Sequence, residues 1–151
     1  MDFNKDGTHF ATVGKEPTVR VYDEETNAIA HNLGSVGWKV FFLNKILKDV
    51  GHNNRVFCVK FIPEEPNLLI TGGWDCNVIF WDIRENKSIR SFIGPKIAGD
   101  AIDYKNGQVI TGANRARGQL ELWDFKQAEL IKSIDYEPGQ KSENGAFVYS
   151  T

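Results

Sequence analysis

The chain has 151 residues, a formal net charge of −2 at pH 7, and 41% hydrophobic residues. This composition fits one globular domain with an apolar core, and the near-neutral charge gives no overall attraction for nucleic acid or an anionic membrane. No run reaches the ~20 apolar residues that span a bilayer, and the first residues lack a basic-then-apolar signal pattern. We therefore expect a cytoplasmic or nuclear protein with no membrane contact.

The residues that usually carry chemistry show no functional spacing. Cys58 and Cys76 form no CxxC pair and no disulfide framework, so we expect two buried thiols in a reducing compartment. His9, His31 and His52 have no metal-ligand spacing with each other or with the cysteines. There is no GxxxxGK[ST] phosphate loop and no nucleophile-elbow serine. The sequence predicts no metal, no cofactor and no catalytic residue.

Residues 1–33 predict short strands joined by polar turns. A turn at 4–7 precedes a strand at about 8–13, and a turn at 15–17 precedes the alternating segment 19–22. A further short strand follows another polar turn. We expect no strand before Phe3, so this first unit starts one strand short.

Residues 31–50 break the rhythm, and we interpret 34–50 as an insertion. One face of a helical wheel carries Val40, Leu43, Ile46, Leu47 and Val50, but Lys39 lies inside that face. The amphipathic signal is therefore only moderate. The simplest interpretation is an excursion that covers an apolar surface. The alternatives are a membrane-surface or partner-binding helix, or a segment that is not native coding sequence.

Residues 51–93 predict a complete antiparallel meander, with strands near 55–61, 68–71, 78–81 and 88–92. The segment Val78–Trp81 is an unbroken apolar run, which is typical of a strand covered on both faces. Residues 94–136 repeat the meander, and residues 146–151 resemble the first strand of a further unit.

A fixed period underlies these units. Asp23, Asp82 and Asp124 end the third predicted strand of each unit and are separated by 59 and 42 positions. The second separation matches the ~40–45 residues of one four-stranded propeller blade, and the first matches after the insertion is removed.

The best-formed unit resembles the WD-repeat (Trp-Asp repeat) β-propeller family. It opens with Gly-His at 51–52 and closes its third strand with Trp-Asp at 81–82, and Thr71 and Asp75 match the other two signature positions. The resemblance implies an all-β fold of four-stranded antiparallel blades in an incomplete ring, with blade units at about 1–33, 51–93 and 94–136. It also implies a structural hydrogen-bond chain of His52, Thr71, Asp75 and Trp81, since buried polar groups must be paired.

The other two units carry weaker versions of this signature, so we expect weaker internal hydrogen bonding there. The first unit places Thr12, Glu16 and Tyr22 at the corresponding positions and has no matching histidine. The third unit has Thr111 and Trp123, with Pro95 in place of the histidine and no aspartate in its turn.

The resemblance also indicates a docking face. In this family the turns between second and third strands lie where partners usually bind, which places Lys15, Trp74, Arg115 and Arg117 there, with Arg55 near the same rim. An exposed tryptophan among arginines has the composition of an interface hot spot. The alternatives are that Trp74 packs on a neighbouring blade, and that the two turn arginines act as solubilisers or contact phosphate or an acidic peptide. The implied function is a non-catalytic scaffold that docks a protein or peptide partner.

Two further functional hypotheses remain. The tetrapeptide at 81–84 resembles the WDxR box of substrate receptors for cullin–RING ubiquitin ligases, in which Arg84 would contact the adaptor. A nucleic-acid-binding or enzymatic propeller is the less favoured alternative. Three blades are fewer than the ~4–8 of closed propellers, so we expect self-association or further blades to complete the ring.

Overall fold

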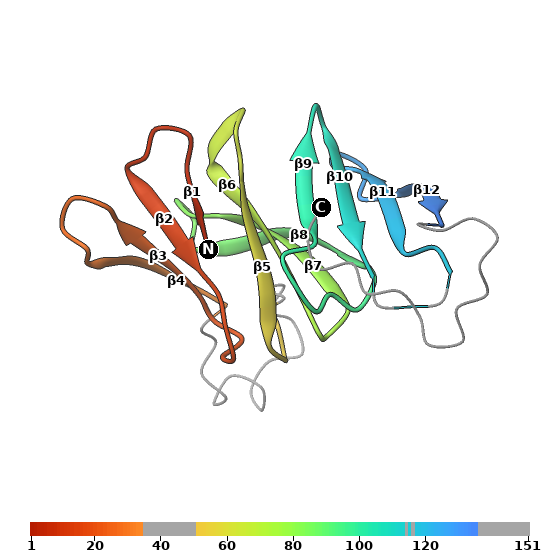
Figure 1. Ribbon diagram of the computed structural model, residues 1–151. Helices are drawn as coiled ribbons and strands as arrows, with labels where there is room; N and C mark the ends of the chain where they lie inside the picture. Colours follow the sequence, from red (N-terminus) through yellow and green to blue (C-terminus); the bar gives the residue numbers. More distant parts are fainter. Residues whose placement is uncertain (35–50, 114, 116, 136–151) are drawn as a thin grey trace.

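The computed structural model describes residues 1–34, 51–113, 115 and 117–135, and in these residues it contains strands and no helix (Figure 1). Three four-stranded antiparallel sheets follow one another along the chain, and we call them blades 1, 2 and 3. Blade 1 comprises β1 (Asp2–Phe3), β2 (His9–Thr12), β3 (Val19–Asp23) and β4 (Ile29–Leu33). Blade 2 comprises β5 (Val56–Ile62), β6 (Glu65–Gly73), β7 (Asn77–Asp82) and β8 (Lys87–Ile93). Blade 3 comprises β9 (Ile102–Lys105), β10 (Gln108–Gly112), β11 (Leu120–Asp124) and β12 (Leu130–Ile134).

The all-β fold of four-stranded antiparallel blades is confirmed, but the expectation that blade 1 starts one strand short is wrong. β1 pairs with β2, with Asp2 opposite Ala11 and Phe3 opposite Phe10. Two residues are too few to give a periodic signal, so this strand is defined by its tertiary contacts. One of them joins it to blade 2, because the Asp2 carboxylate accepts a hydrogen bond of 2.8 Å from the backbone N–H of Phe61.

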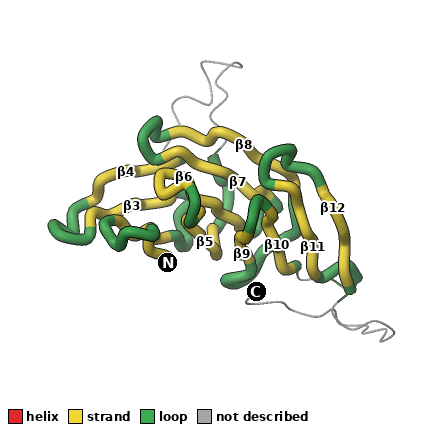
Figure 2. Tube along the Cα trace, turned by 90° about the horizontal axis from the view of Figure 1, so that it is seen from above, coloured by secondary structure: helices red, strands yellow, loops and turns green. Residues whose placement is uncertain are grey.

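The blades fan out from one side, as the view from above shows. The inner strands β1, β5 and β9 lie close together, and the outer strands β4, β8 and β12 spread around them (Figure 2). The ring is therefore incomplete in this chain. The expected insertion, apart from Gly34, and the expected start of a further blade at 146–151 lie outside the described residues.

Two apolar clusters join the three blades, and blade 2 contributes to both. The apolar run of β7 divides between them: Ile79 and Trp81 face blade 1, whereas Val78 and Phe80 face blade 3. All four side chains are at most 1% exposed. The unbroken run thus follows from a strand that alternates its side chains between two buried faces.

The turns alternate between two rims of the fan. We call the rim that carries the β2–β3, β6–β7 and β10–β11 turns the Trp74 rim. Backbone hydrogen bonds join neighbouring blades there, since Val56 N–H donates to Gly14 O at 3.0 Å and Ile97 N–H donates to Gly73 O at 3.1 Å. Gly73 is needed at this point, because a Cβ would lie 2.3 Å from the carbonyl oxygen of Arg55.

The turns between third and fourth strands, at the opposite rim, share one backbone feature. A residue in the left-handed region occupies the same place in each: Asn27 (φ 54°), Asn86 (φ 52°) and Ala128 (φ 56°). Asparagine tolerates this conformation, whereas alanine adopts it at a cost.

Candidate functional site

The four signature residues of blade 2 lie in one hydrogen-bonded chain. The Asp75 carboxylate accepts from His52 Nδ1 at 2.9 Å, and His52 Nε2 lies 2.7 Å from Thr71 Oγ1. Trp81 Nε1 donates to the same Thr71 oxygen at 2.8 Å. With a neutral imidazole, Thr71 therefore donates to His52 and accepts from Trp81. The His52 and Asp75 side chains are 0% and 1% exposed, so the chain is sealed from solvent and presents no group to a substrate.

The environment of Asp75 favours the carboxylate over the acid. Burial raises the pKa of Asp75, but the hydrogen bonds that its carboxylate accepts, first from His52, outweigh it, and the net pKa lies below the ordinary value. The backbone N–H groups of Asn53 and Asn77 also donate to this carboxylate, at 3.0 and 3.2 Å. The β6–β7 turn and the start of the blade are thereby fixed to each other.

Blades 1 and 3 contain less of this chain. In blade 3, Trp123 Nε1 donates to Thr111 Oγ1 at 3.0 Å. In its turn Arg115 pairs with Glu121, whose second carboxylate oxygen is buried without a hydrogen-bond partner in the described structure. In blade 1, Thr12 and Tyr22 lie on the face that no other described blade covers, and Glu16 pairs instead with Arg20.

Trp74 lies at the Trp74 rim in an aromatic and cationic setting. It is 41% exposed, and its ring contacts Phe57 with centroids 5.2 Å apart. Two cations lie over the indole: Arg55 Cζ at 5.8 Å and Lys96 Nζ at 5.1 Å from its centroid. Trp74 therefore packs within its own blade and leaves part of its ring open, with cations around it.

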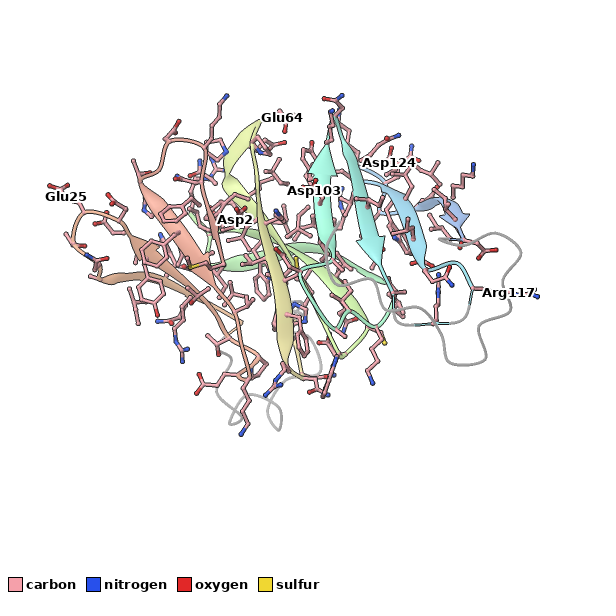
Figure 3. All side chains as sticks on the ribbon, viewed as in Figure 1. Asp2, Glu25, Glu64, Asp103, Arg117 and Asp124 are labelled. Atoms are coloured by element: carbon pink, nitrogen blue, oxygen red, sulfur yellow. The ribbon has the colours of Figure 1, made fainter. Side chains whose placement is uncertain are left out.

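The other predicted docking residues extend along the same rim. Lys15 lies in the β2–β3 turn, beside a pocket of about 230 Å³, and Arg117 lies in the β10–β11 turn. Figure 3 shows Arg117 below Asp124, toward the rim opposite the one that carries Glu64. Three carboxylates at the Trp74 rim have partners of their own. Asp75 pairs with His52, Glu121 pairs with Arg115, and Asp100 accepts a hydrogen bond of 2.9 Å from the Cys58 thiol.

Arg84 lies at the other rim, because it follows the end of β7 whereas Trp74 precedes its start. Its Nε and Nη2 donate to the two Asp82 oxygens at 3.0 and 2.6 Å. The hydrogen bond from Arg84 lowers the pKa of Asp82. The Arg84 side chain is nevertheless 65% exposed. The structure does not bring Arg84 together with the Trp74 rim.

The two thiols differ, so the expectation that both are buried is wrong for one of them. Cys58 is buried, and burial together with the hydrogen bond and charge of Asp100 raises the pKa of its thiol. Cys76 is half-buried and lies in the β6–β7 turn, where its φ is 59°. Within the described ranges, no group of three His, Cys, Asp or Glu residues has the arrangement of a metal site. These residues also contain no helix long and apolar enough to cross a membrane.

Sequence reasoning missed Phe57 and Lys96 beside Trp74. Phe57 lies between the buried residues Val56 and Cys58 on β5, so strand alternation could have identified it as an outward-facing aromatic. Lys96 lies in the connection from β8 to β9 and has no periodic signal. The bond from Ile97 N–H to Gly73 O holds this connection beside the β6–β7 turn.

Comparisons with known proteins agree with this geometry. A family model described as WD domain, G-beta repeat matches residues 44–82. Nuclear distribution protein PAC1 of Candida tropicalis is 30% identical over 86 residues, covering 57% of this chain and 14% of that protein. F-box/WD repeat-containing protein 8 of Mus musculus is 24% identical over 123 residues, covering 74% of this chain and 20% of that protein.

The solved structures that match show the same fold. A structure of U3-55K and a crystal structure of RRP9 WD40 repeats each superpose with a TM-score of 0.68 at 17% identity. The match covers 87% of this chain and about a third of each of theirs, 35% and 34%. The chain thus spans about a third of these structures and about a fifth or less of its curated relatives.

Three fanned four-stranded sheets with a sealed His–Thr–Asp–Trp chain define a β-propeller, here with an incomplete ring. The family model and the relatives specify the kind: residues 44–82 match a WD repeat, and the chain is similar to WD-repeat proteins.

Proposed function

We propose that this chain is a non-catalytic docking scaffold whose Trp74 rim binds a protein or peptide segment that is acidic and carries an apolar side chain. The observation that carries the proposal is the partly exposed Trp74 ring between Arg55 and Lys96. Tryptophan and arginine are the residues most enriched at interface hot spots. An apolar side chain would pack on the indole, and a neighbouring carboxylate would pair with the cations.

The charge distribution supports an acidic partner. Lys15, Arg55, Lys96 and Arg117 lie along one rim of a chain whose net charge is −2. Electrostatic complementarity of this kind raises the association rate and the specificity more than the affinity. We place this interaction in the cytoplasm or nucleus, the compartments in which unpaired thiols such as Cys58 persist.

The test is a selection of random displayed peptides on the intact chain, followed by affinity measurements on the enriched peptides. We expect acidic residues next to an aromatic or aliphatic residue, and weaker binding at high salt. Trp74→Ala should weaken binding by about 2 kcal/mol or more, the size of a hot-spot truncation. Ile131→Ala is the matched control, because Ile131 is 50% exposed on the outer strand β12. Equal affinities for the wild type and Trp74→Ala would refute this site.

Ubiquitin-ligase adaptor binding through Arg84 is the second candidate. Two observations favour it: the exposed Arg84 guanidinium, and relatives whose name is F-box/WD repeat-containing protein 8. Against it, two nitrogens of the guanidinium already donate to Asp82. Adaptor pull-down by the wild type but not by Arg84→Ala would support it, and equal pull-down would refute it.

A further inference from the structure

Blades 1 and 3 each have one face outside the two apolar clusters of the described residues. On blade 1, one row of side chains crosses all four strands, with Phe3 opposite Phe10, Phe10 opposite Tyr22, and Tyr22 opposite Ile29. Phe10 and Tyr22 stack with centroids 4.9 Å apart, and Phe3 and Ile29 are each 49% exposed. We call this surface the blade 1 open face.

The corresponding surface of blade 3 carries the row in which Asp103, Ile110, Leu122 and Lys132 are paired across the strands. Ile110 and Leu122 are half-buried and belong to neither cluster. We call this surface the blade 3 open face. The blade 1 open face is apolar, whereas the blade 3 open face has an apolar centre, Ile110 and Leu122, between the charged Asp103 and Lys132. Both open faces lie at the ends of the fan.

The two open faces match the two sides of the existing junctions. Phe10 and Tyr22 occupy the places of Leu69 and Trp81, which receive blade 1 in the first junction. Ile110 and Leu122 occupy the places of Ile70 and Phe80, which pack onto blade 3 in the second junction. A blade 3 open face against a blade 1 open face would therefore repeat a junction that this chain already forms twice.

A polar contact at the first junction has its counterparts on the open faces. Asp2 accepts from the backbone N–H of Phe61 across that junction. Asp103 holds the place of Asp2 in β9, because it lies opposite Ile110 as Asp2 lies opposite Ala11. Phe3 holds the place of Phe61, since it lies opposite Phe10 as Phe61 lies opposite Leu69. Figure 3 shows Asp2 and Asp103 each beside the inner strand of its own blade.

The outer strands offer a second, charged counterpart. Arg90 on β8 donates to the carbonyl oxygen of Phe125 on blade 3. Lys132 holds the place of Arg90, because it lies opposite Leu122 as Arg90 lies opposite Phe80. Glu24 holds the place of Phe125, since each follows the aspartate that ends its third strand. In a repeated junction Lys132 would thus donate to the backbone carbonyl of Glu24, as Arg90 donates to that of Phe125, and the Glu24 carboxylate would add negative charge on the same residue.

We propose that two copies of this chain associate head to tail, each blade 3 open face on the partner's blade 1 open face, to close a six-bladed ring around a two-fold axis. Heterologous contacts close only when the rotation returns to its start. The described blades of two copies number six, within the ~4–8 of closed propellers, whereas those of one copy number three and those of three copies nine. A face four strands wide and five residues long covers about 300 Å². Four such faces total about 1,200 Å², the lower end of stable interfaces.

The first test is the mass of the 151-residue chain by sedimentation over a range of concentrations. We expect a dimer with twice the 17.1 kDa of one chain. Tyr22→Glu and Leu122→Glu place a charge on one open face each, and each should raise the dimer dissociation constant more than about 100-fold. An equimolar mixture of the two variants should recover heterodimers through the one junction that keeps both native faces. Ile89→Glu, at a 50% exposed isoleucine of blade 2, is the control.

A second set of variants changes only exposed charges, so that folding is preserved. Lys132→Glu and Glu24→Lys should each weaken the dimer about 2- to 30-fold, as expected for two exposed ion pairs per ring, and the double variant should restore part of the affinity. A monomer at high concentration, an open series of larger oligomers, or a dimer weakened by changes on only one open face would each overturn the proposal. Independent effects of Lys132→Glu and Glu24→Lys would equally overturn it.

Discussion

The threonine at the same place in each blade allows a quantitative test of the buried hydrogen-bond chain. Valine has nearly the shape of threonine and lacks its hydroxyl group, so Thr→Val removes hydrogen bonds with little change in volume. In blade 2, Thr71→Val leaves two buried nitrogens without a partner, His52 Nε2 and Trp81 Nε1. In blade 3, Thr111→Val leaves one, Trp123 Nε1. For Thr12 of blade 1, no side-chain hydrogen bond is present among the described residues.

The expected losses of stability follow from these numbers of unpaired groups. A buried polar group without a partner costs about 1–3 kcal/mol. Thr71→Val should therefore lower the free energy of unfolding by about 2–6 kcal/mol, and Thr111→Val by about 1–3 kcal/mol. Thr12→Val should stay within about 0.5 kcal/mol of the wild type.

Urea denaturation followed by tryptophan fluorescence measures these differences at fixed protein concentration. A double-mutant cycle with Trp81→Phe isolates the contact between Trp81 and Thr71, and should give a coupling of about 1 kcal/mol. The reasoning fails if Thr71→Val costs no more than Thr111→Val, or if Thr12→Val costs as much as either.

Three further predictions follow from described features. The pKa of Asp75 is lowered in the folded chain, so the stability that its carboxylate contributes should be present above pH 3.8 and lost as the pH falls through the folded pKa. In Asp75→Asn, the free energy of unfolding measured by urea titration should depend less on pH in this acidic range. Half-buried Cys76 should react with a thiol reagent in the folded chain, whereas buried Cys58 should react only in denaturant, and equal rates would contradict the assignment. Ala128→Asn should raise the free energy of unfolding by about 1 kcal/mol, and with it the midpoint temperature, because Ala128 adopts φ 56° where the other blades have asparagine. An unchanged midpoint temperature would contradict this strain.

The sequence predicted those parts of the fold that repeat. The spacing of Asp82 and Asp124 and the apolar run Val78–Trp81 are properties of a whole blade, and each is visible in one dimension. β1 was missed because its two residues form a strand only through their pairing with β2 and the contact of Asp2 with Phe61. Strands this short depend on tertiary contacts more than on local pattern.

The candidate site was predictable where it follows the blade pattern and not where it depends on connections. Trp74 could be placed at a rim because turns alternate between the two ends of a meander. Lys96 could not, because the irregular path from β8 to β9 brings it to the indole. For Arg84, the ion pair with Asp82 required side-chain geometry, since residues two apart at a strand end approach only in a particular turn.

The position of blade 2 between two junctions has a consequence for how the chain comes apart. In a linear array of repeats, stability is about the sum of each repeat's own contribution and of the contacts between neighbours. In a single copy that is not associated with another, opening blade 1 or blade 3 breaks one junction, whereas opening blade 2 breaks both. Amide protons of β6 and β7 should therefore exchange last, and those of the end blades first. Loss of structure should begin at the ends of the fan and reach the His52–Trp81 chain only in the final, cooperative step.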